Sequence, residues 1–223
     1  MAVEHPRTPN RRDFLIAAAL AGAGALVRAS GTQDPDDPFA TLPERVLQNA
    51  RQNGLIMIHR PTPARLSWRT QLTHDNEPGT PLVISGVVAA PDGRTKAAGV
   101  IVYAYNTDAE GYYGENRTEY PPRIYGWMKT DGAGRFELRT IHPGSYPGMR
   151  VPAHVHFELW GGGYPLQWTE ELRFEGDKYL TSDMRDQDRS LGEFHRIQHL
   201  TRDADGVEHC QLTIRLQREG TFK

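Results

Sequence analysis

The chain has 223 residues, a formal net charge of −2 at pH 7 and a single cysteine. One cysteine excludes an intramolecular disulfide framework and any metal site built from several cysteines. The slightly acidic balance argues against a nucleic-acid partner, which usually selects for a basic excess. Gly and Pro together make 38 of the 223 residues, against a usual level of roughly 12%, and this favours one turn-rich β domain.

The first thirty residues have the layout of an export signal. Arg11 and Arg12 precede an apolar stretch over 14–27, and small residues follow up to Ala29. This order is typical of a secretory signal, and the paired arginines resemble the twin-arginine type. We expect residues 1–30 to direct export by the twin-arginine route to the periplasm or the cell exterior. Without cleavage, the same segment would be an N-terminal membrane anchor.

Residues 31–80 read as a linker that holds one short helix. An Asp- and Pro-rich stretch opens the segment, and Thr41 and Glu44 have the spacing of a capping box. Apolar residues at helical spacing follow until Gly54. This pattern predicts a short amphipathic helix that ends at the glycine.

From residue 81 onward the pattern changes to short strands. The runs are β-branched or alternating, and turns rich in Gly, Pro and Asp separate them. We therefore predict an all-β fold, an antiparallel β-sandwich, over residues 81–223. The expected strands span 82–89, 99–105, 135–141, 153–160, 169–174 and 207–216. In the last of these, Cys210 falls on the apolar face, so we expect a core thiol and no ligand.

Two histidines face one side of a predicted strand. His154 and His156 are separated by one residue, which places their backbones about 7 Å apart on the same face. Tyr146 lies in the preceding turn, and Tyr112 and Tyr113 lie in an upstream polar loop. Phenolate oxygen and imidazole nitrogen suit ferric iron. A trivalent cation would keep a phenol deprotonated although its ordinary pKa is near 10.

Four longer runs make the pattern specific. DAEGYY, GWMKTDGAGRFELRTIHPGSYPG, VPAHVHFELWGGGY and LRFEGD occur in this order. They resemble the catalytic domain of intradiol ring-cleavage dioxygenases. Because the N-terminal part is too short for the helical dimerisation region of the catechol enzymes, the similarity is closer to the protocatechuate 3,4-dioxygenase β-subunit type. The resemblance implies an Fe(III) cofactor held by Tyr113, Tyr146, His154 and His156, with Tyr112 as the alternative to Tyr113.

The same resemblance implies a reaction. A small aromatic diol of the catechol type would chelate the iron, and Tyr146 would leave the metal at that moment. Oxygen from O₂ would enter between the two hydroxylated carbons and give a muconate-type diacid. The sequence does not choose among catechol, protocatechuate, hydroxyquinol and larger diols, and it leaves open whether the chain forms a homo-oligomer.

The sequence departs from the family pattern beside the expected site. Val151 stands where the family usually has Arg before PAHxH, and Arg150 would replace that arginine only through a bulged loop. Gln167 lies where the family often has Gln-Arg, so Tyr146, Arg150 and Gln167 are the candidate catalytic residues. Gly148 takes the place of a tryptophan common in protocatechuate enzymes, which implies a more open pocket.

Two other functions compete with this interpretation. Stretches such as TDGAGRFEL also resemble transthyretin-like β-sandwiches, which would make the chain a non-catalytic binding module. That alternative explains the strands but not the paired tyrosines and histidines. A zinc hydrolase or a cupin is the third hypothesis, and Glu158 lies too close to His156 for the cupin ligand pattern.

Overall fold

The computed structural model describes residues 39–118 and 120–222, in two units divided after Pro61. The expected export signal lies outside the described residues. The first unit holds helix α2 (Glu44–Gln52) and the short 3-10 helix η1 (Met57–His59). Within the described ranges, no helix has the length and apolar character needed to cross a membrane.

The predicted short helix is present as α2, but its first turn differs from the expectation. Pro43 is the residue before the helix, and no side chain caps the start. The capping box expected at Thr41 and Glu44 is therefore wrong. The carboxylate of Glu44 instead accepts a hydrogen bond from Arg51 at 2.8 Å, and the fixed φ of proline already suits a helix entry.

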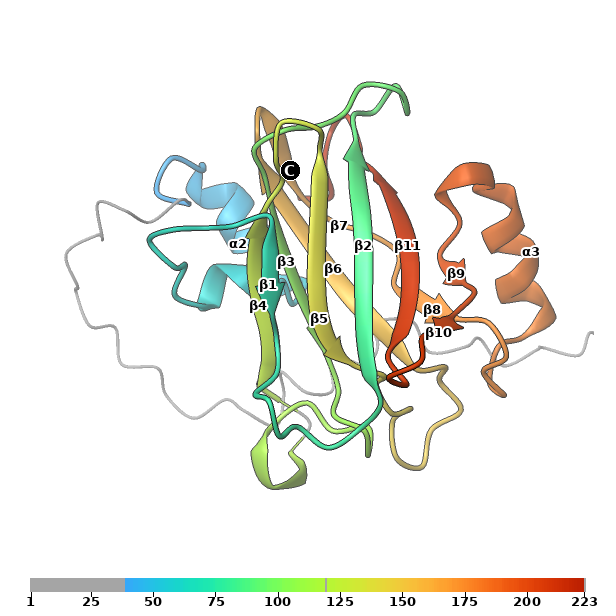
Figure 1. Ribbon diagram of the computed structural model, residues 1–223. Coiled ribbons are helices and arrows are strands. Elements are labelled where there is room, and N and C mark those ends of the chain that lie inside the picture. The colour runs from blue at the N-terminus through green and yellow to red at the C-terminus, as the bar shows by residue number, and fades with distance from the viewer. Residues whose placement is uncertain (1–38, 119, 223) are drawn as a thin grey trace, which may run out of the picture. The chain divides into compact units, whose positions relative to one another are not determined.

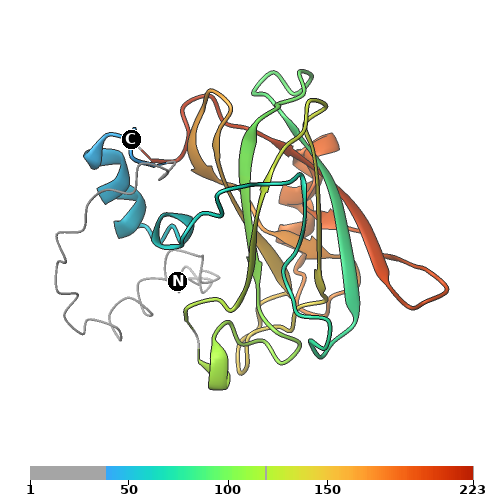
Figure 2. The ribbon, with the colours of Figure 1, turned by 60° about the vertical axis from the view of Figure 1, so that its left-hand side comes forward.

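The second unit is a β-sandwich whose two sheets lie as layers (Figures 1 and 2). One sheet has the strand order β1-β5-β2-β11-β10, and the other has β4-β3-β6-β8-β9 with β7 added to β6. The strands are β1 Arg69–Gln71, β2 Pro81–Ala89, β3 Val100–Asn106, β4 Ile124–Lys129, β5 Arg135–Ile141, β6 His154–Gly161, β7 Tyr164–Trp168, β8 Leu172–Phe174, β9 Ile197–Gln198, β10 Thr201–Arg202 and β11 Glu208–Arg215. The connections contain helix α3 (Ser182–Ser190) and the short 3-10 helices η2 (Glu115–Arg117) and η3 (Gly192–Phe194).

The sandwich prediction is confirmed, although the sheets are mixed and not purely antiparallel. β2 runs parallel to β11, β1 to β5, and β8 to β9. Parallel neighbours need a crossover connection, and here the chain visits the second sheet between β2 and β11. Strand β1 lies inside the segment expected to be a linker, and it joins the first sheet through β5.

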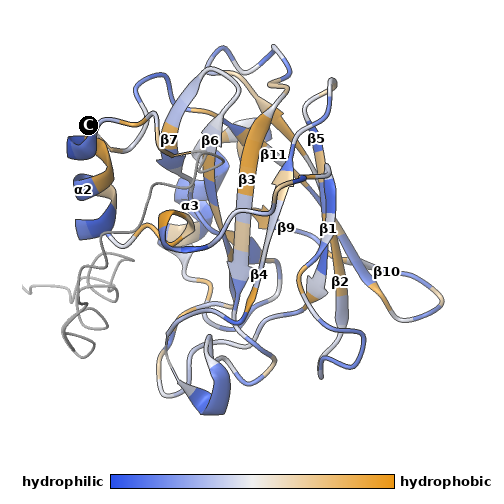
Figure 3. Cartoon of the chain, turned by 90° about the vertical axis from the view of Figure 1, so that its left-hand side faces the viewer, coloured by the Kyte–Doolittle hydropathy of each residue, from blue (hydrophilic) through white to orange (hydrophobic). Residues whose placement is uncertain are grey.

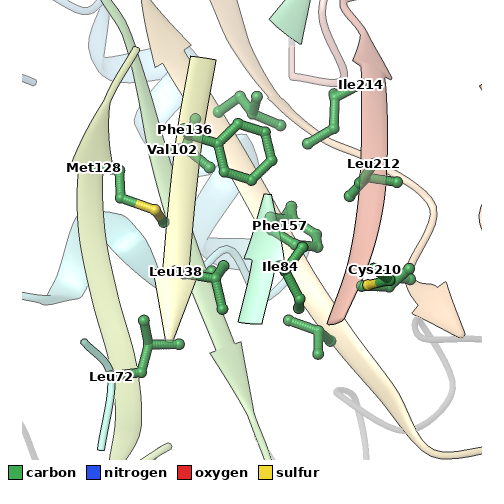
Figure 4. Close-up of a cluster of buried hydrophobic side chains, with 14 of the residues drawn as sticks. Leu72, Ile84, Val102, Met128, Phe136, Leu138, Phe157, Cys210, Leu212 and Ile214 are labelled. Atoms are coloured by element: carbon green, nitrogen blue, oxygen red, sulfur yellow. The ribbon is translucent and has the colours of Figure 1, made fainter. Parts of the chain in front are cut away.

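Apolar side chains from the two sheets meet between the layers (Figure 4). Ile84 and Phe136 come from the first sheet and Phe157 from the second, and all three are buried. Cys210 belongs to the same core, as predicted. Gly86 is required beneath the ring of Phe136, because a Cβ there would lie 2.2 Å from it.

Strand β6 is buried on both of its faces. Val155 and Phe157 point into the core, while His154 and His156 on the other face are only 7% and 5% exposed. β6 runs between β3 and β8, and β3 is strongly hydrophobic over part of its length (Figure 3). The His-x-His pair is therefore held by a central strand and is shielded from water.

Candidate metal centre

Four donor atoms from two loops and one strand converge at the start of β6. The Oη of Tyr113 lies 2.5 Å from the Oη of Tyr146 and 2.7 Å from the Nε2 of His156. The Oη of Tyr146 lies 2.8 Å from the Nε2 of His154, and the two Nε2 atoms are 3.0 Å apart. We call these four atoms the four-donor cluster.

Glycines let the two tyrosine loops approach each other closely. Gly111 has φ +93°, and a Cβ on it would lie 2.0 Å from the carbonyl oxygen of Ser145. A Cβ on Gly144 would lie 2.5 Å from the backbone nitrogen of Gly111. Only glycine permits such contact and such a φ at low cost. The loops that carry Tyr113 and Tyr146 are thus locked together by their backbones.

An ion-pair network fixes the loop that carries Tyr113. The carboxylate of Asp108 accepts hydrogen bonds from the backbone of Tyr112 at 2.9 Å and from Arg123 at 3.3 Å. Arg123 also forms two hydrogen bonds of 2.7 Å with Glu77, and this carboxylate raises the pKa of the guanidinium above its ordinary value. The backbone nitrogen of Arg123 donates to the carbonyl of Tyr113 at 2.8 Å, so the network ends directly at a cluster residue.

Contacts on the far side of each imidazole set the orientation of the histidines. His154 Nδ1 lies 2.7 Å from the carbonyl oxygen of Pro152. A carbonyl only accepts, so Nδ1 carries the hydrogen and Nε2 turns its lone pair to the cluster. His156 Nδ1 faces Glu171 Oε1 at 3.9 Å, and the ring of Tyr105 stacks on the imidazole with centroids 4.5 Å apart.

The chemistry of the four-donor cluster fits a hard metal cation. With hydrogens on both Nδ1 atoms, the two Nε2 lone pairs face each other at 3.0 Å. A cation bound by all four atoms would remove this repulsion, and phenolate with imidazole is a donor set suited to ferric iron. Among the described residues, no group of three or more His, Cys, Asp or Glu could hold a metal, so a four-ligand site here depends on the tyrosines.

Comparison with known proteins assigns the family. The profile of the family described as Dioxygenase matches residues 57–213. The chain belongs to this dioxygenase family. All four residues of the cluster fall within the matched range.

Several relatives of this dioxygenase-family chain have named activities. The chlorocatechol 1,2-dioxygenase of Pseudomonas sp. strain P51 is 30% identical over 129 residues, which are 50% of this chain and 50% of the relative. The 6-chlorohydroxyquinol 1,2-dioxygenase of Cupriavidus pinatubonensis is 35% identical over 122 residues, 47% of this chain and 44% of the relative. The protocatechuate 3,4-dioxygenase beta chain of Burkholderia cepacia is 28% identical over 116 residues, 47% and 49% of the two chains. The chain matches about half the length of these curated relatives.

Solved structures share the sandwich. The dioxygenase domain of a dioxygenase carbohydrate-binding protein fusion from Streptomyces sp. SirexAA-E aligns with a TM-score of 0.51 at 26% identity, over 72% of this chain and 95% of that one. The 3-chlorocatechol 1,2-dioxygenase of Rhodococcus opacus 1CP aligns with a TM-score of 0.53 at 22% identity, over 66% and 64% of the two chains. The latter likeness shows the fold alone.

In this member of the dioxygenase family, the structure separates the two tyrosines that the sequence left as alternatives. Tyr113 is 6% exposed and lies in the four-donor cluster. Tyr112 points elsewhere, with the guanidinium of Arg117 5.9 Å from its ring centre. Arg150, one of the candidate catalytic residues, is exposed and has no hydrogen bond or ion pair with any residue that the structure describes.

Gln167 does not reach the cluster, so its assignment as a catalytic residue is wrong. The register of β7 on β6 places Gln167 opposite Leu159, and residues directly opposite share a face of the sheet. Leu159 points into the core, away from the histidines. The amide of Gln167 donates to the carbonyl of Pro165 at 2.9 Å and accepts from the backbone of Gln217 at 2.7 Å, which ties β7 to the chain after β11.

The sequence analysis missed two charged residues that share the face of the histidines. Arg173 stands directly opposite His154 in the register of β8 on β6. Glu171 is on the same face by alternation, because Leu172 between them points into the core. Arg173 donates a hydrogen bond of 2.8 Å to Glu171. The alternation of Glu171, Leu172 and Arg173 could be read from the sequence. The strand pairing that brings Arg173 beside His154 could not.

Proposed function

We propose that this chain is a non-haem Fe(III)-dependent intradiol dioxygenase. Its reaction is the cleavage of a catechol-type aromatic diol by O₂ between the two hydroxylated carbons, which yields a muconate-type diacid. The observation that carries the proposal is the four-donor cluster of Tyr113, Tyr146, His154 and His156, in which each donor atom lies within 3.0 Å of two others. Family membership and relatives that act on catechols support it.

Tyr146 is the ligand best placed to give way to a substrate. It is half-buried beside an exposed turn, whereas Tyr113 is buried. A Cβ on Gly148 in that turn would meet no atom within 4 Å, so the turn that follows Tyr146 is open at this position. Tyr146 would hold the metal through its Oη, and we assign to this oxygen the role of taking a proton from the incoming diol.

The other residues of the site orient the donor atoms and balance the charge of the substrate. A bound ferric ion would supply chelation of the two diol oxygens and polarise the ring for reaction with O₂. His154 and His156 keep their Nε2 atoms aimed at the centre through their contacts with Pro152 and Glu171. Arg173, opposite His154, takes the charge-stabilising role that the sequence analysis gave to Arg150. Both atoms of O₂ enter the product, one into each new carboxylic acid.

Iron loading with optical spectroscopy tests the proposal. The purified protein, reconstituted with iron in air, should bind iron near stoichiometrically and turn burgundy from tyrosinate-to-iron charge transfer. Oxygen uptake should then follow addition of a diol from a panel of catechol, chlorocatechol, hydroxyquinol and protocatechuate. A protein that stays colourless and iron-free after reconstitution would overturn the proposal and favour the transthyretin-like binding module, which needs no such cluster.

We also propose export by the twin-arginine route, on the basis of Arg11, Arg12 and the apolar stretch that follows them. This route carries folded proteins, which would allow iron to be bound before export. Fractionation of cells that express the full chain tests the proposal, with Arg11→Lys and Arg12→Lys changed together as the comparison. Equal amounts of both proteins outside the cytoplasm would contradict it.

A further inference from the structure

A pocket lined by none of the four cluster residues lies at the ends of β7 and β11. This pocket, of about 440 Å³, opens between the chain after each of these strands and the segment that contains η3. Its lining includes Trp168, Glu170, Phe194, Arg196, Arg215 and Arg218. None of these residues has a role in the proposed reaction.

Arg196 is the unusual member of this lining. Arg196 is only 6% exposed, and its Nη1 has no hydrogen-bond partner among the described residues. Within the described residues the hydrogen bonds of Arg196 come from its backbone, whose nitrogen donates to the carboxylate of Asp188 and whose carbonyl accepts from Arg173 at 2.9 Å. A buried guanidinium without a hydrogen-bonded anion costs free energy, so such a group marks a site that an anion would complete.

The charge around Arg196 favours an anion. Arg215 and Arg218 line the same pocket, and Glu170 is the one acidic residue in that lining. Burial lowers the pKa of Arg196 to about 10, and the carboxylates of Glu170 and Asp188 oppose this shift without forming an ion pair with it. Arg196 therefore remains positively charged at neutral pH, and a bound anion would relieve its desolvation.

Apolar walls restrict the kind of anion. Trp168, Phe194 and Leu216 form part of the lining, and the guanidinium of Arg215 lies 4.6 Å from the ring centre of Phe194. Of these three residues only Trp168 is partly exposed, so a flat apolar body against its ring would bury more apolar surface than a small inorganic anion. Planar guanidinium groups also match the two oxygens of a carboxylate.

We propose that this pocket binds a small organic carboxylate with an apolar, aromatic body, anchored by the guanidinium of Arg196. Arg215 and Arg218 add positive charge at the mouth, and Trp168 and Phe194 contact the body of the ligand. The inference does not depend on the proposed dioxygenase activity, because it uses no residue of the four-donor cluster.

Calorimetric titration of the full chain with benzoate tests the site. Benzoate should bind. Benzamide lacks the charge and inorganic phosphate lacks the apolar body, so the affinity for each should be lower than that for benzoate by a factor of roughly ten or more. Arg196→Gln should weaken benzoate binding roughly tenfold or more. Arg139→Gln removes a charge from the exposed face of β5 and should leave the affinity unchanged.

Each other outcome overturns the proposal. Benzamide binding as tightly as benzoate would remove the anchoring role of charge, and phosphate binding as tightly would leave a simple anion site. Benzoate binding that persists in Arg196→Gln would place the ligand elsewhere on the molecule. If that variant fails to fold by circular dichroism, Glu170→Gln decides the question, because loss of the competing carboxylate should tighten benzoate binding and unchanged or weaker binding contradicts the proposal.

Discussion

The Oε1 of Glu171 lies 3.9 Å from the Nδ1 of His156, on the side of the imidazole away from the four-donor cluster. The other oxygen of the carboxylate is held by Arg173 at 2.8 Å, so the direction of the carboxylate is fixed. A carboxylate behind a ligating histidine sets the tautomer of the ring and raises its strength as a ligand. At 3.9 Å this contact is in the range of an ion pair and is too long for a hydrogen bond, and we expect Glu171 to position His156 through its charge.

Replacing Glu171 by glutamine tests this role. Glu171→Gln should lower iron affinity or activity roughly 10- to 100-fold, the usual cost of losing such a partner, and should shift the charge-transfer band. Iron titration and the visible spectrum measure both effects. Glu175→Gln is the matched control, because that carboxylate pairs at 3.1 Å with the exposed His199. An unshifted band with normal iron affinity in Glu171→Gln would contradict the role.

The charge beside the substrate can be located by comparing two arginines. Arg173→Gln should lower kcat/KM roughly 100-fold, the scale for losing one charge-stabilising donor, because Arg173 lies opposite His154. Arg150→Gln should leave kcat/KM nearly unchanged, since Arg150 is exposed. Steady-state oxygen uptake measures both variants. A larger loss of kcat/KM in Arg150→Gln than in Arg173→Gln would support Arg150 as the catalytic arginine, as the sequence predicts.

The two neighbouring tyrosines should behave differently. Tyr113→Phe removes an atom that lies 2.5 Å from Tyr146 and 2.7 Å from His156, so it should abolish stoichiometric iron binding or shift the visible band strongly. Tyr112→Phe should retain colour and turnover, because its ring contacts Arg117 and lies outside the cluster. Iron analysis and the absorption spectrum provide the measurement, and identical spectra for both variants would refute the ligand role of Tyr113.

The backbone contact between the tyrosine loops should matter even though it contains no ligand. Gly111→Ala places a Cβ 2.0 Å from the carbonyl of Ser145 at φ +93°, so the loops must separate. We expect loss of iron binding and a destabilisation of roughly 1–3 kcal/mol. Gly132→Ala, whose Cβ would meet nothing within 4 Å, should change neither property. Thermal unfolding and iron content measure the two effects. Normal iron binding in Gly111→Ala would argue against a role for the backbone contact between the loops.

The buried thiol predicts a pH effect. Burial, assisted by the charge of Glu208, raises the pKa of Cys210 to about 12, whereas an unfolded cysteine titrates near 8.5. The folded chain should therefore resist iodoacetamide at pH 8 and react with it in urea. The contribution of the thiol to stability should be complete below pH 8 and fall as pH rises towards 12, because only the unfolded chain ionises there. Rapid labelling of the folded chain at pH 8 would contradict the buried position.

Strands with a clean alternation were predictable from the sequence, whereas β4 and the short or polar elements were not. β5 and β6 were located to within a residue because their apolar faces alternate cleanly. β1, β9 and β10 span only two or three residues, too few to show a period. Helix α3 has Met184 as its single apolar residue and has no buried residue, so it lacks the apolar stripe that marks a helix.

The candidate site was predictable where it depends on local order along the chain. Tyr146, His154 and His156 lie within eleven residues, and the strand period puts both histidines on one face. Arg173 and Gln167 depend on how β8 and β7 register on β6. A shift of one residue reverses the face, and no local pattern encodes it. The sequence therefore indicated the donor atoms but not the charges around them.

The hydrogen bond from His154 to the carbonyl of Pro152 has a consequence for redesign. Every amino acid brings the same carbonyl, so no side-chain replacement at position 152 deletes the acceptor while the backbone keeps its path. Proline restricts that path further through its fixed φ. A redesign of the four-donor cluster to bind a chosen metal would start with one imidazole already oriented, and its sequence changes could be confined to the other three donors.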